Sequence, residues 1–170
     1  MDQVWKAFEA NEVTHSTVHH LMTISQLYDE LGYARVTDVA SRLGITRGSA
    51  SITLKALEKH ELIERDTNGF LRLSTRGKFI AQSTRVKKNL MRKFLQEILG
   101  VNEEDADVDS CKIEHLIGAE SGHQLCAFVH FLTSDSPAAR EFMQAFRKFC
   151  KSECQVADCN TCEDHCLFAA

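Results

Sequence analysis

The chain has 170 residues, of which 44% are hydrophobic and 26% charged, so it is long enough to bury a hydrophobic core without disulfide support. A single proline and eight glycines favour a mostly α-helical fold with few loops. The net charge of -4 at pH 7 excludes a protein that coats nucleic acid over its whole surface, and no apolar stretch reaches the roughly 20 residues that a membrane span needs.

Three helices are predicted in the first third of the sequence. Apolar residues three positions apart in residues 15–31 predict the first of them. Residues 36–43 form a short amphipathic pattern that Gly44 ends, and Thr46 is a good N-cap for a third helix that runs to Lys59. Two helices joined by a turn of about three residues that contains glycine are typical of a helix-turn-helix motif.

A β-hairpin is predicted directly after this motif. Residues 62–65 and 70–73 alternate apolar and polar side chains on either side of Asn68-Gly69, a dipeptide that favours a tight turn. A hairpin that follows the second helix of a helix-turn-helix is the wing of a winged helix. We therefore expect residues 1–75 to form a winged helix-turn-helix DNA-binding domain.

The outward face of the second helix of the motif can enter the major groove of B-DNA. Arg47 can reach a guanine edge or a phosphate, and Ile52 can contact a thymine methyl group. The residues that we predict to contact DNA are Thr46, Arg47, Gly48, Ser51, Ile52 and Lys55 on this helix, and Arg65 and Arg72 on the hairpin. The alternative is that this face is only solvated, as most polar helix faces are.

The second half of the sequence is mostly helical in pattern. Residues 75–99 predict a long helix with a basic run, which Gly100 ends. The acidic residues 102–109 are expected to form a loop before a helix that begins near Ser110. A last helix is expected over residues 137–149.

Cys111, Glu114 and His115 are candidate metal ligands. Their spacing of i, i+3 and i+4 places the three side chains on one helical face, within reach of one ion. A thiolate, a carboxylate and an imidazole together suit Fe(II), Mn(II), Co(II) or Zn(II) rather than calcium or magnesium. The alternative is an ordinary half-buried cysteine beside two polar surface residues.

Four segments carry a resemblance to a known family: residues 32–40 (GYARVTDVA), 71–77 (LRLSTRG), 94–101 (FLQEILGV) and 111–115 (CKIEH). Together they resemble the diphtheria-toxin-repressor and manganese-transport-regulator (DtxR/MntR) family of metal-dependent repressors. The resemblance implies a homodimer that binds a palindromic operator in double-stranded DNA when metal is bound. It also implies that residues 76–148 form a helical domain for dimerisation and metal sensing.

The resemblance further implies the ligands of the regulatory metal. In this family the primary site joins a residue of the first helix to the helix that carries Cys111, Glu114 and His115. Here that implies His19, with Met22 one turn further on as a candidate extra ligand. His19 departs from the methionine or aspartate that is usual in the family, although imidazole is a competent ligand.

The same resemblance gives expectations about the number and the identity of the bound metals. The family's ancillary site would need ligands where this sequence has Lys88 and Arg92, so we expect that site to be absent. The thiolate of Cys111 favours Fe(II) over Mn(II) as the effector. We therefore expect an iron-responsive transcriptional repressor and not an enzyme.

Five cysteines crowd residues 149–170 with the spacing C-x3-C-x4-C-x2-C-x3-C: Cys150, Cys154, Cys159, Cys162 and Cys166. The first residues carry charge and no apolar run, so we expect a cytoplasmic protein whose thiols stay reduced. The C-x4-C-x2-C spacing favours an iron–sulfur cluster over zinc, as a second sensor. The preferred ligands are Cys154, Cys159, Cys162 and Cys166, with Cys150 or His165 as a substitute. Cys126 lies in an apolar stretch and is expected in the core.

Three alternatives stay open. One is a small redox protein that uses an iron–sulfur cluster, with a winged helix that binds protein instead of DNA; the sequence offers no nucleophile elbow, phosphate loop or dinucleotide fingerprint in its favour. The second is a DNA-binding regulator whose tail holds structural zinc. The third is a regulator in which the tail cluster is the only sensor.

Overall fold

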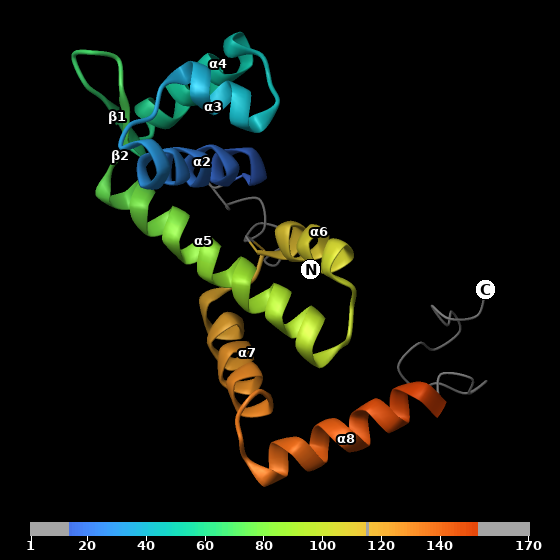
Figure 1. Ribbon diagram of the computed structural model, residues 1–170. Helices are drawn as coiled ribbons and strands as arrows, with labels where there is room; N and C mark the ends of the chain where they lie inside the picture. Colours follow the sequence, from blue (N-terminus) through green and yellow to red (C-terminus); the bar gives the residue numbers. More distant parts are fainter. Residues whose placement is uncertain (1–13, 115, 153–170) are drawn as a thin grey trace, which may run out of the picture.

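The computed structural model describes residues 14–114 and 116–152, which form a mostly helical chain with one β-hairpin (Figure 1). The elements in chain order are α2 (His15–Leu31), α3 (Val36–Leu43), α4 (Arg47–Lys59), β1 (Ile63–Arg65), β2 (Leu71–Leu73), α5 (Thr75–Lys93), the π-helical segment η1 (Phe94–Ile98), α6 (Glu103–Ile113), α7 (Ala119–Leu132) and α8 (Pro137–Ser152). Within these described ranges, no helix is both long and apolar enough to cross a membrane.

The predicted helix-turn-helix is confirmed, because its helices begin and end where the local signals place them. Gly32 and Gly44 end α2 and α3 with φ values of 76° and 64°, in the left-handed region that glycine adopts without strain. Thr46 is the N-cap of α4, and its side-chain oxygen accepts a hydrogen bond from the backbone N–H of Ser49. The turn between α3 and α4 therefore has fixed geometry at both ends.

The predicted hairpin is also present, with strands of three residues each. The strands β1 and β2 are antiparallel, and Ile63 pairs with Leu73. At the tip, the side chain of Asp66 accepts hydrogen bonds from the backbone N–H groups of Asn68 and Phe70. The backbone N–H of Leu71 donates to the carbonyl of Ala34, so the hairpin is tied to the linker between α2 and α3.

One hydrophobic core holds the winged helix together. It lies between α2, α3, α4, the hairpin and the start of α5. Its completely buried side chains include Leu21 and Ile24 of α2, Leu54 of α4 and Leu71 of β2. Burying each of these side chains contributes roughly 1.5–3 kcal/mol to folding. The helix α4, the second helix of the helix-turn-helix, is therefore supported by a rigid core.

The helix α5 connects the two halves of the molecule. It packs against α2 on one side and against α6 further along its length (Figure 1). Contacts between α2 and α6 are few by comparison, so these two helices are positioned mainly by the helix that both of them touch. Beyond Lys93 the helix widens into η1, where the sequence had predicted a regular helix up to residue 99.

The prediction of a loop over residues 102–109 is wrong, because α6 occupies most of that stretch. Asn102 caps the helix by accepting a hydrogen bond from the backbone N–H of Asp105. The acidic residues Glu103, Glu104 and Asp105 fill the first turn, where negative charge stabilises the helix dipole. The acidic run is therefore a signal for the start of a helix.

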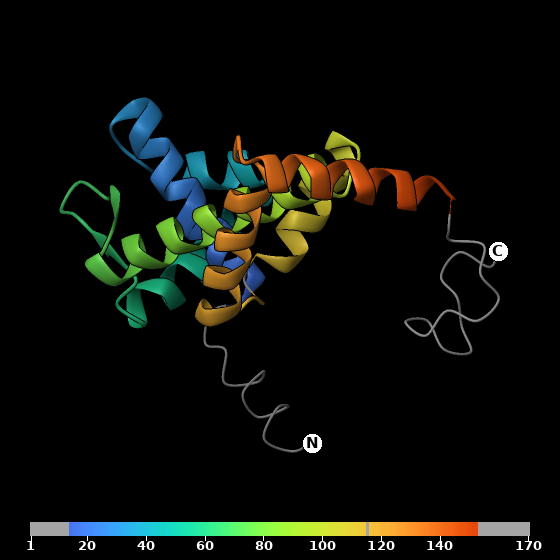
Figure 2. The same ribbon diagram turned by 90° about the horizontal axis from the view of Figure 1, so that it is seen from below.

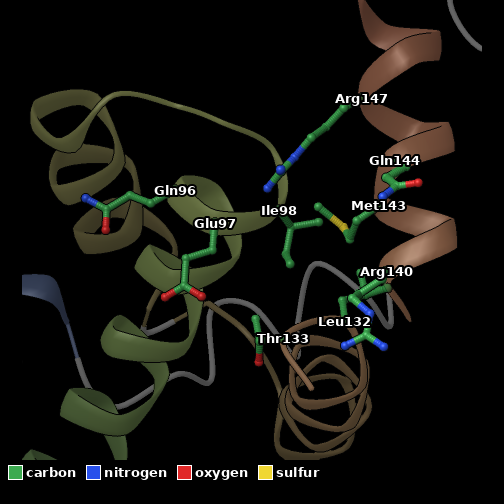
Figure 3. Close-up of a pocket in the computed structure, with 9 residues that line it drawn as sticks. All are labelled: Gln96, Glu97, Ile98, Leu132, Thr133, Arg140, Met143, Gln144 and Arg147. Atoms are coloured by element: carbon green, nitrogen blue, oxygen red, sulfur yellow. The ribbon is translucent and has the colours of Figure 1, made fainter. Parts of the chain in front are cut away.

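The helices α7 and α8 lie on the side of α5 away from the winged helix (Figure 1), and α8 extends away from the rest of the chain (Figure 2). A groove of about 520 Å³ lies between η1 and α8, and Ile98 and Met143 point toward one another across it (Figure 3). Its lining residues are Gln96, Glu97, Ile98, Leu132, Thr133, Arg140, Met143, Gln144 and Arg147. They include no histidine or cysteine, so the groove is not the candidate metal site. Cys126 on α7 is exposed, and its prediction as a core residue is wrong.

Candidate metal centre and DNA-binding surface

The structure brings the first helix and the CKIEH segment together at one side-chain contact. Nε2 of His19, on α2, lies 3.2 Å from Sγ of Cys111, on α6, although 92 residues separate them in sequence. Two ligands of one tetrahedral ion, with bonds of about 2.0–2.1 Å to nitrogen and 2.3 Å to sulfur, lie about 3.5 Å apart. The His19–Cys111 distance therefore differs by only a few tenths of an ångström from what a shared ion requires.

A third ligand atom lies beside this pair. Ring nitrogens of His15 and His19 and the sulfur of Cys111 all lie within 4.8 Å of one another. His15 is exposed, whereas His19 and Cys111 are half-buried, so the group reaches the surface on the His15 side. His15 is not among the ligands predicted from sequence, although its i, i+4 spacing from His19 places both rings on one face of α2.

Glu114 provides a second test of whether a cation fits here. It is the C-cap of α6, and its side chain has no exposed surface. Neither of its carboxylate oxygens has a hydrogen-bond partner. A buried, unpartnered carboxylate costs several kcal/mol, and a bound cation would remove that cost. Glu114 lies outside the group of three ligand atoms that His15, His19 and Cys111 form.

The surroundings of Glu114 and Cys111 raise the pKa of both groups and so favour their neutral forms. Burial raises the pKa of Glu114 to about 7, with Asp107 adding to the shift and Lys88 opposing it. Burial also raises the pKa of the Cys111 thiol, and the negative charges of Glu114 and Asp107 raise it further. A divalent cation would reverse this balance, because it stabilises both the thiolate and the carboxylate.

Lys88 of α5 contributes a fixed positive charge at the edge of this region. Its Nζ lies 3.2 Å from a carboxylate oxygen of Asp107 on α6. Lys87, its neighbour, donates a hydrogen bond of 2.6 Å to the carbonyl of Ile117 and so anchors the chain that follows α6. The part of α5 that faces α6 is therefore already occupied by cations.

The other predicted ligands have different positions. Met22 lies one turn after His19 and packs against the winged-helix core, where it lines a small cavity with Ala81 and Gln82 of α5. His20 is buried, and its Nδ1 contacts the carbonyl of Ser16, so it does not share the position of His19. His115 lies outside the described residues, as do Cys154, Cys159, Cys162, Cys166 and the side chain of Cys150.

The predicted DNA-contacting face of α4 is open to solvent. Arg47, Gly48 and Lys55 are exposed, and Ser51 is half-buried. The side chain of Ile52 is 73% exposed. Its side chain is therefore accessible for the predicted contact with a thymine methyl group. Thr46 is also exposed, in addition to its role as the N-cap of α4.

The two arginines of the hairpin lie in different environments. The guanidinium of Arg65 donates a 2.8 Å hydrogen bond to Glu58, which joins the wing to α4. Arg72 is exposed and pairs with Glu64 across the two strands. Its side chain therefore lies on the opposite face of the hairpin from that of Arg65. Arg72 is thus exposed for a phosphate contact, whereas Arg65 would have to leave Glu58 or share its donors.

Comparison with known families divides the chain at the end of the wing. The family model described as "Iron dependent repressor, metal binding and dimerisation domain" matches residues 74–142. A model described as "MarR family" matches residues 14–69, which contain α2, α3, α4 and β1 of the winged helix. The first match contains α5 and α6, and the second contains α2 and α4.

Several curated proteins are similar over most of the chain. The HTH-type transcriptional regulator MntR of Geobacillus thermodenitrificans (strain NG80-2) is 30% identical over 122 residues, which are 72% of this chain and 86% of that protein. The protein of the same name from Bacillus velezensis is 29% identical over 135 residues, which are 79% of this chain and 94% of that protein.

Solved structures share the fold. IdeR of T. acidophilum matches with a TM-score of 0.57 at 23% identity, over 65% of this chain and 52% of that one. The manganese regulator SloR matches with a TM-score of 0.61 at 19% identity, over 66% and 53%. The chain thus spans about half the length of these two proteins. The curated relatives and the family model show that the chain belongs to the DtxR/MntR family of metal-dependent transcriptional regulators.

Proposed function

We propose that this protein is an iron-responsive repressor that binds a palindromic operator as a homodimer. The observation that carries the proposal is the 3.2 Å contact between His19 of α2 and Cys111 of α6. It joins the DNA-binding half of the molecule to the metal-binding half at a pair of good ligands for a transition metal. Glu114 and His115 complete the proposed primary site, with Met22 as a further candidate.

The donor set favours iron over manganese. Thiolate and imidazole bind Fe(II) more tightly than Mn(II), which is the weakest binder in the divalent series. The names of similar proteins do not distinguish the two metals, since the family model is described as an iron-dependent repressor and SloR as a manganese regulator. The proposal of iron therefore rests on the candidate ligands of this chain. They include one sulfur and one imidazole nitrogen at contact distance.

Metal binding would act through the position of α2. A bound divalent ion supplies positive charge and directional bonds to the side chains around it. When His19 and Cys111 share a cation, α2 cannot shift relative to α6, and the winged helix keeps one orientation on α5. In a dimer that orientation sets the distance between the two α4 helices, which must match the half-sites of the operator. DNA must in turn raise metal affinity by the same factor.

The surfaces that we propose for DNA and for the partner subunit are separate. Thr46, Arg47, Gly48, Ser51, Ile52 and Lys55 of α4 would contact the major groove, and Arg65 and Arg72 the DNA backbone or minor groove. The helices α7 and α8 expose Phe128, Phe131 and Phe142, each by more than 40%, which is consistent with a dimer interface. The proposed regions are residues 1–75 for DNA, 76–148 for sensing and dimerisation, and 149–170 for the cysteine tail.

Replacing Cys111 with alanine is expected to abolish the metal dependence of DNA binding. The DNA probe is a palindrome selected from random duplexes by the Fe(II)-loaded protein. In the wild type, Fe(II) should raise the affinity for this probe about 10- to 100-fold over metal-free protein, as measured by fluorescence anisotropy under anaerobic conditions. The variant should show less than a twofold effect, because α2 and α6 no longer share a ligand pair.

Cys126→Ala is the matched control, because Cys126 is an exposed cysteine on α7 and lies apart from the His19 contact. This control should respond to Fe(II) like the wild type. His115→Ala should behave like Cys111→Ala if the primary site is the sensor. A full metal response in both Cys111→Ala and His115→Ala would contradict the proposal and favour the tail as the only sensor.

For the tail, we propose an iron–sulfur cluster on Cys154, Cys159, Cys162 and Cys166, with Cys150 as a substitute. Anaerobic purification followed by elemental and acid-labile sulfide analysis should give iron together with sulfide. Substituting the four cysteines with serine should remove the sulfide and leave the metal response through Cys111 in place. One zinc per chain without sulfide would show that the tail holds structural zinc instead.

A further inference from the structure

We propose that His15 is a ligand of the regulatory metal, so that α2 supplies two imidazoles, from His15 and His19, to the ion that Cys111 also binds. The inference rests on the proposed function, since it concerns the same ion. It adds a residue outside the CKIEH segment and its partner His19. Among the described residues, α2 and Cys111 would then supply two nitrogens and one sulfur to the ion.

The geometry of α2 places the two histidines together. His15 and His19 are separated by one helical turn, and their ring centroids lie 4.2 Å apart with planes tilted by 55°. Their ligand nitrogens and the sulfur of Cys111 lie within 4.8 Å of one another. Ligand atoms around a tetrahedral ion are about 3.3–3.8 Å apart, so small side-chain rotations are enough to close the site.

The pattern of exposed and buried side chains favours a bound ion over a purely structural contact between His15, His19 and Cys111. His15 is exposed and His19 half-buried, so an ion can enter from solvent and keep a water molecule as a further ligand. Glu114, one turn after Cys111 in sequence, is fully buried, and its oxygens have no hydrogen-bond partner. Its carboxylate adds negative charge near Cys111 and favours a cation over a neutral occupant.

The donor set also predicts selectivity. Two imidazoles and one thiolate suit Zn(II), Co(II) and Fe(II), and they bind Mn(II) weakly. His15 lies in the first turn of α2, directly after the N-cap Thr14. An ion bound there would join the beginning of α2 to the last turn of α6, which contains Cys111. His15 would thus strengthen the link that positions the winged helix.

The test measures metal binding directly. The parent is the full chain with the five tail cysteines replaced by serine, so that only the proposed site binds thiophilic metal. Co(II) is titrated anaerobically into the parent and into His15→Ala, and binding is followed by the thiolate-to-cobalt absorption. We expect Co(II) to bind at least about tenfold more weakly to His15→Ala. X-ray absorption of the Zn(II)-loaded proteins should show one sulfur ligand in both, and one imidazole fewer in the variant than in the parent.

His123→Ala is the control, because His123 is an exposed histidine on α7. His15→Gln, checked for folding by circular dichroism, repeats the test with a side chain of similar size. If both His15 variants keep the parent's affinity and imidazole count while His19→Ala and Cys111→Ala lose the metal, His15 is not a ligand and the proposed function stands. If His19→Ala and Cys111→Ala also bind metal like the parent, both proposals are wrong.

Discussion

Replacing Gly77 with alanine is expected to destabilise the protein by at least about 3 kcal/mol. Gly77 lies in the first turn of α5, where a Cβ atom would stand only 2.0 Å from the carbonyl oxygen of Leu62. That carbonyl accepts a hydrogen bond from the backbone N–H of Ser74, and Leu62 itself is buried in the winged-helix core. The backbone on both sides is therefore fixed, and the clash cannot be relieved by rotating a side chain.

Gly122→Ala is the matched control for this substitution. Gly122 is inside α7, and a Cβ atom there would meet nothing closer than a methyl carbon of Ile117 at 3.7 Å. Alanine should stabilise this helix by up to about 1 kcal/mol, because it restricts the unfolded chain and has higher helix propensity. Urea unfolding of both variants measures the difference. Equal stability of Gly77→Ala and the wild type would show that the contact with Leu62 is not as close as described.

The position of Gly77 also connects stability with regulation. It lies where the wing meets α5, next to Ser74, whose hydroxyl donates to the carbonyl of Glu61. The start of α5 is therefore tied to the chain that leads into the hairpin. The proposed regulation requires such a link, because a change in the position of α2 must change the orientation of the whole winged helix and not only of one part of it.

The winged helix could be predicted from sequence because its boundaries are local. Gly44 and Thr46 specify the turn of the helix-turn-helix by backbone conformation and capping, and neither depends on a distant contact. Asn68-Gly69 and the alternating strands likewise specify the hairpin. The prediction of a loop before α6 was wrong because an acidic run is common in loops, whereas Asn102 followed by acidic residues is also a helix-capping pattern.

The candidate site could be predicted only in part. Cys111 and its relation to His19 followed from a family resemblance, because no local pattern links residues 92 positions apart. His15 was missed for a related reason: an i, i+4 histidine pair is informative only when a third ligand from another helix faces it. Burial of Glu114 depends on how α6 packs on α5, and the sequence pattern of α6 contains no sign of it.

Replacing Glu114 with glutamine is expected to stabilise the metal-free protein and weaken metal binding. The folded-state pKa of Glu114 is raised to about 7 from an ordinary value of 4.5. The folded state therefore binds more protons than the unfolded state between these pH values, and the stability of the metal-free protein should fall by about 2–3 kcal/mol as pH rises through this window. Glutamine carries no titrating proton, so the variant should lose this part of the pH dependence.

Urea unfolding at pH 5 and pH 8, in the presence of a chelator, measures the effect. Glu104→Gln is the control, since Glu104 is an exposed carboxylate on the same helix. The control should keep the pH dependence of the wild type. If Glu114→Gln keeps it as well, the buried carboxylate is not the group that titrates, and the account of its burial is wrong.

Metal reverses the sign of the Glu114 effect. A cation at the site needs the thiolate of Cys111 and benefits from the carboxylate of Glu114, and the pKa of each group is raised in the metal-free protein. Binding must therefore release protons, so the affinity for Fe(II) should increase as pH rises from 6 to 8. Glu114→Gln should bind Fe(II) more weakly than the wild type at pH 8, where the metal-free variant is the more stable of the two. Glu114→Gln should raise the stability of the metal-free protein and lower its Fe(II) affinity only if the carboxylate of Glu114 interacts with the bound cation.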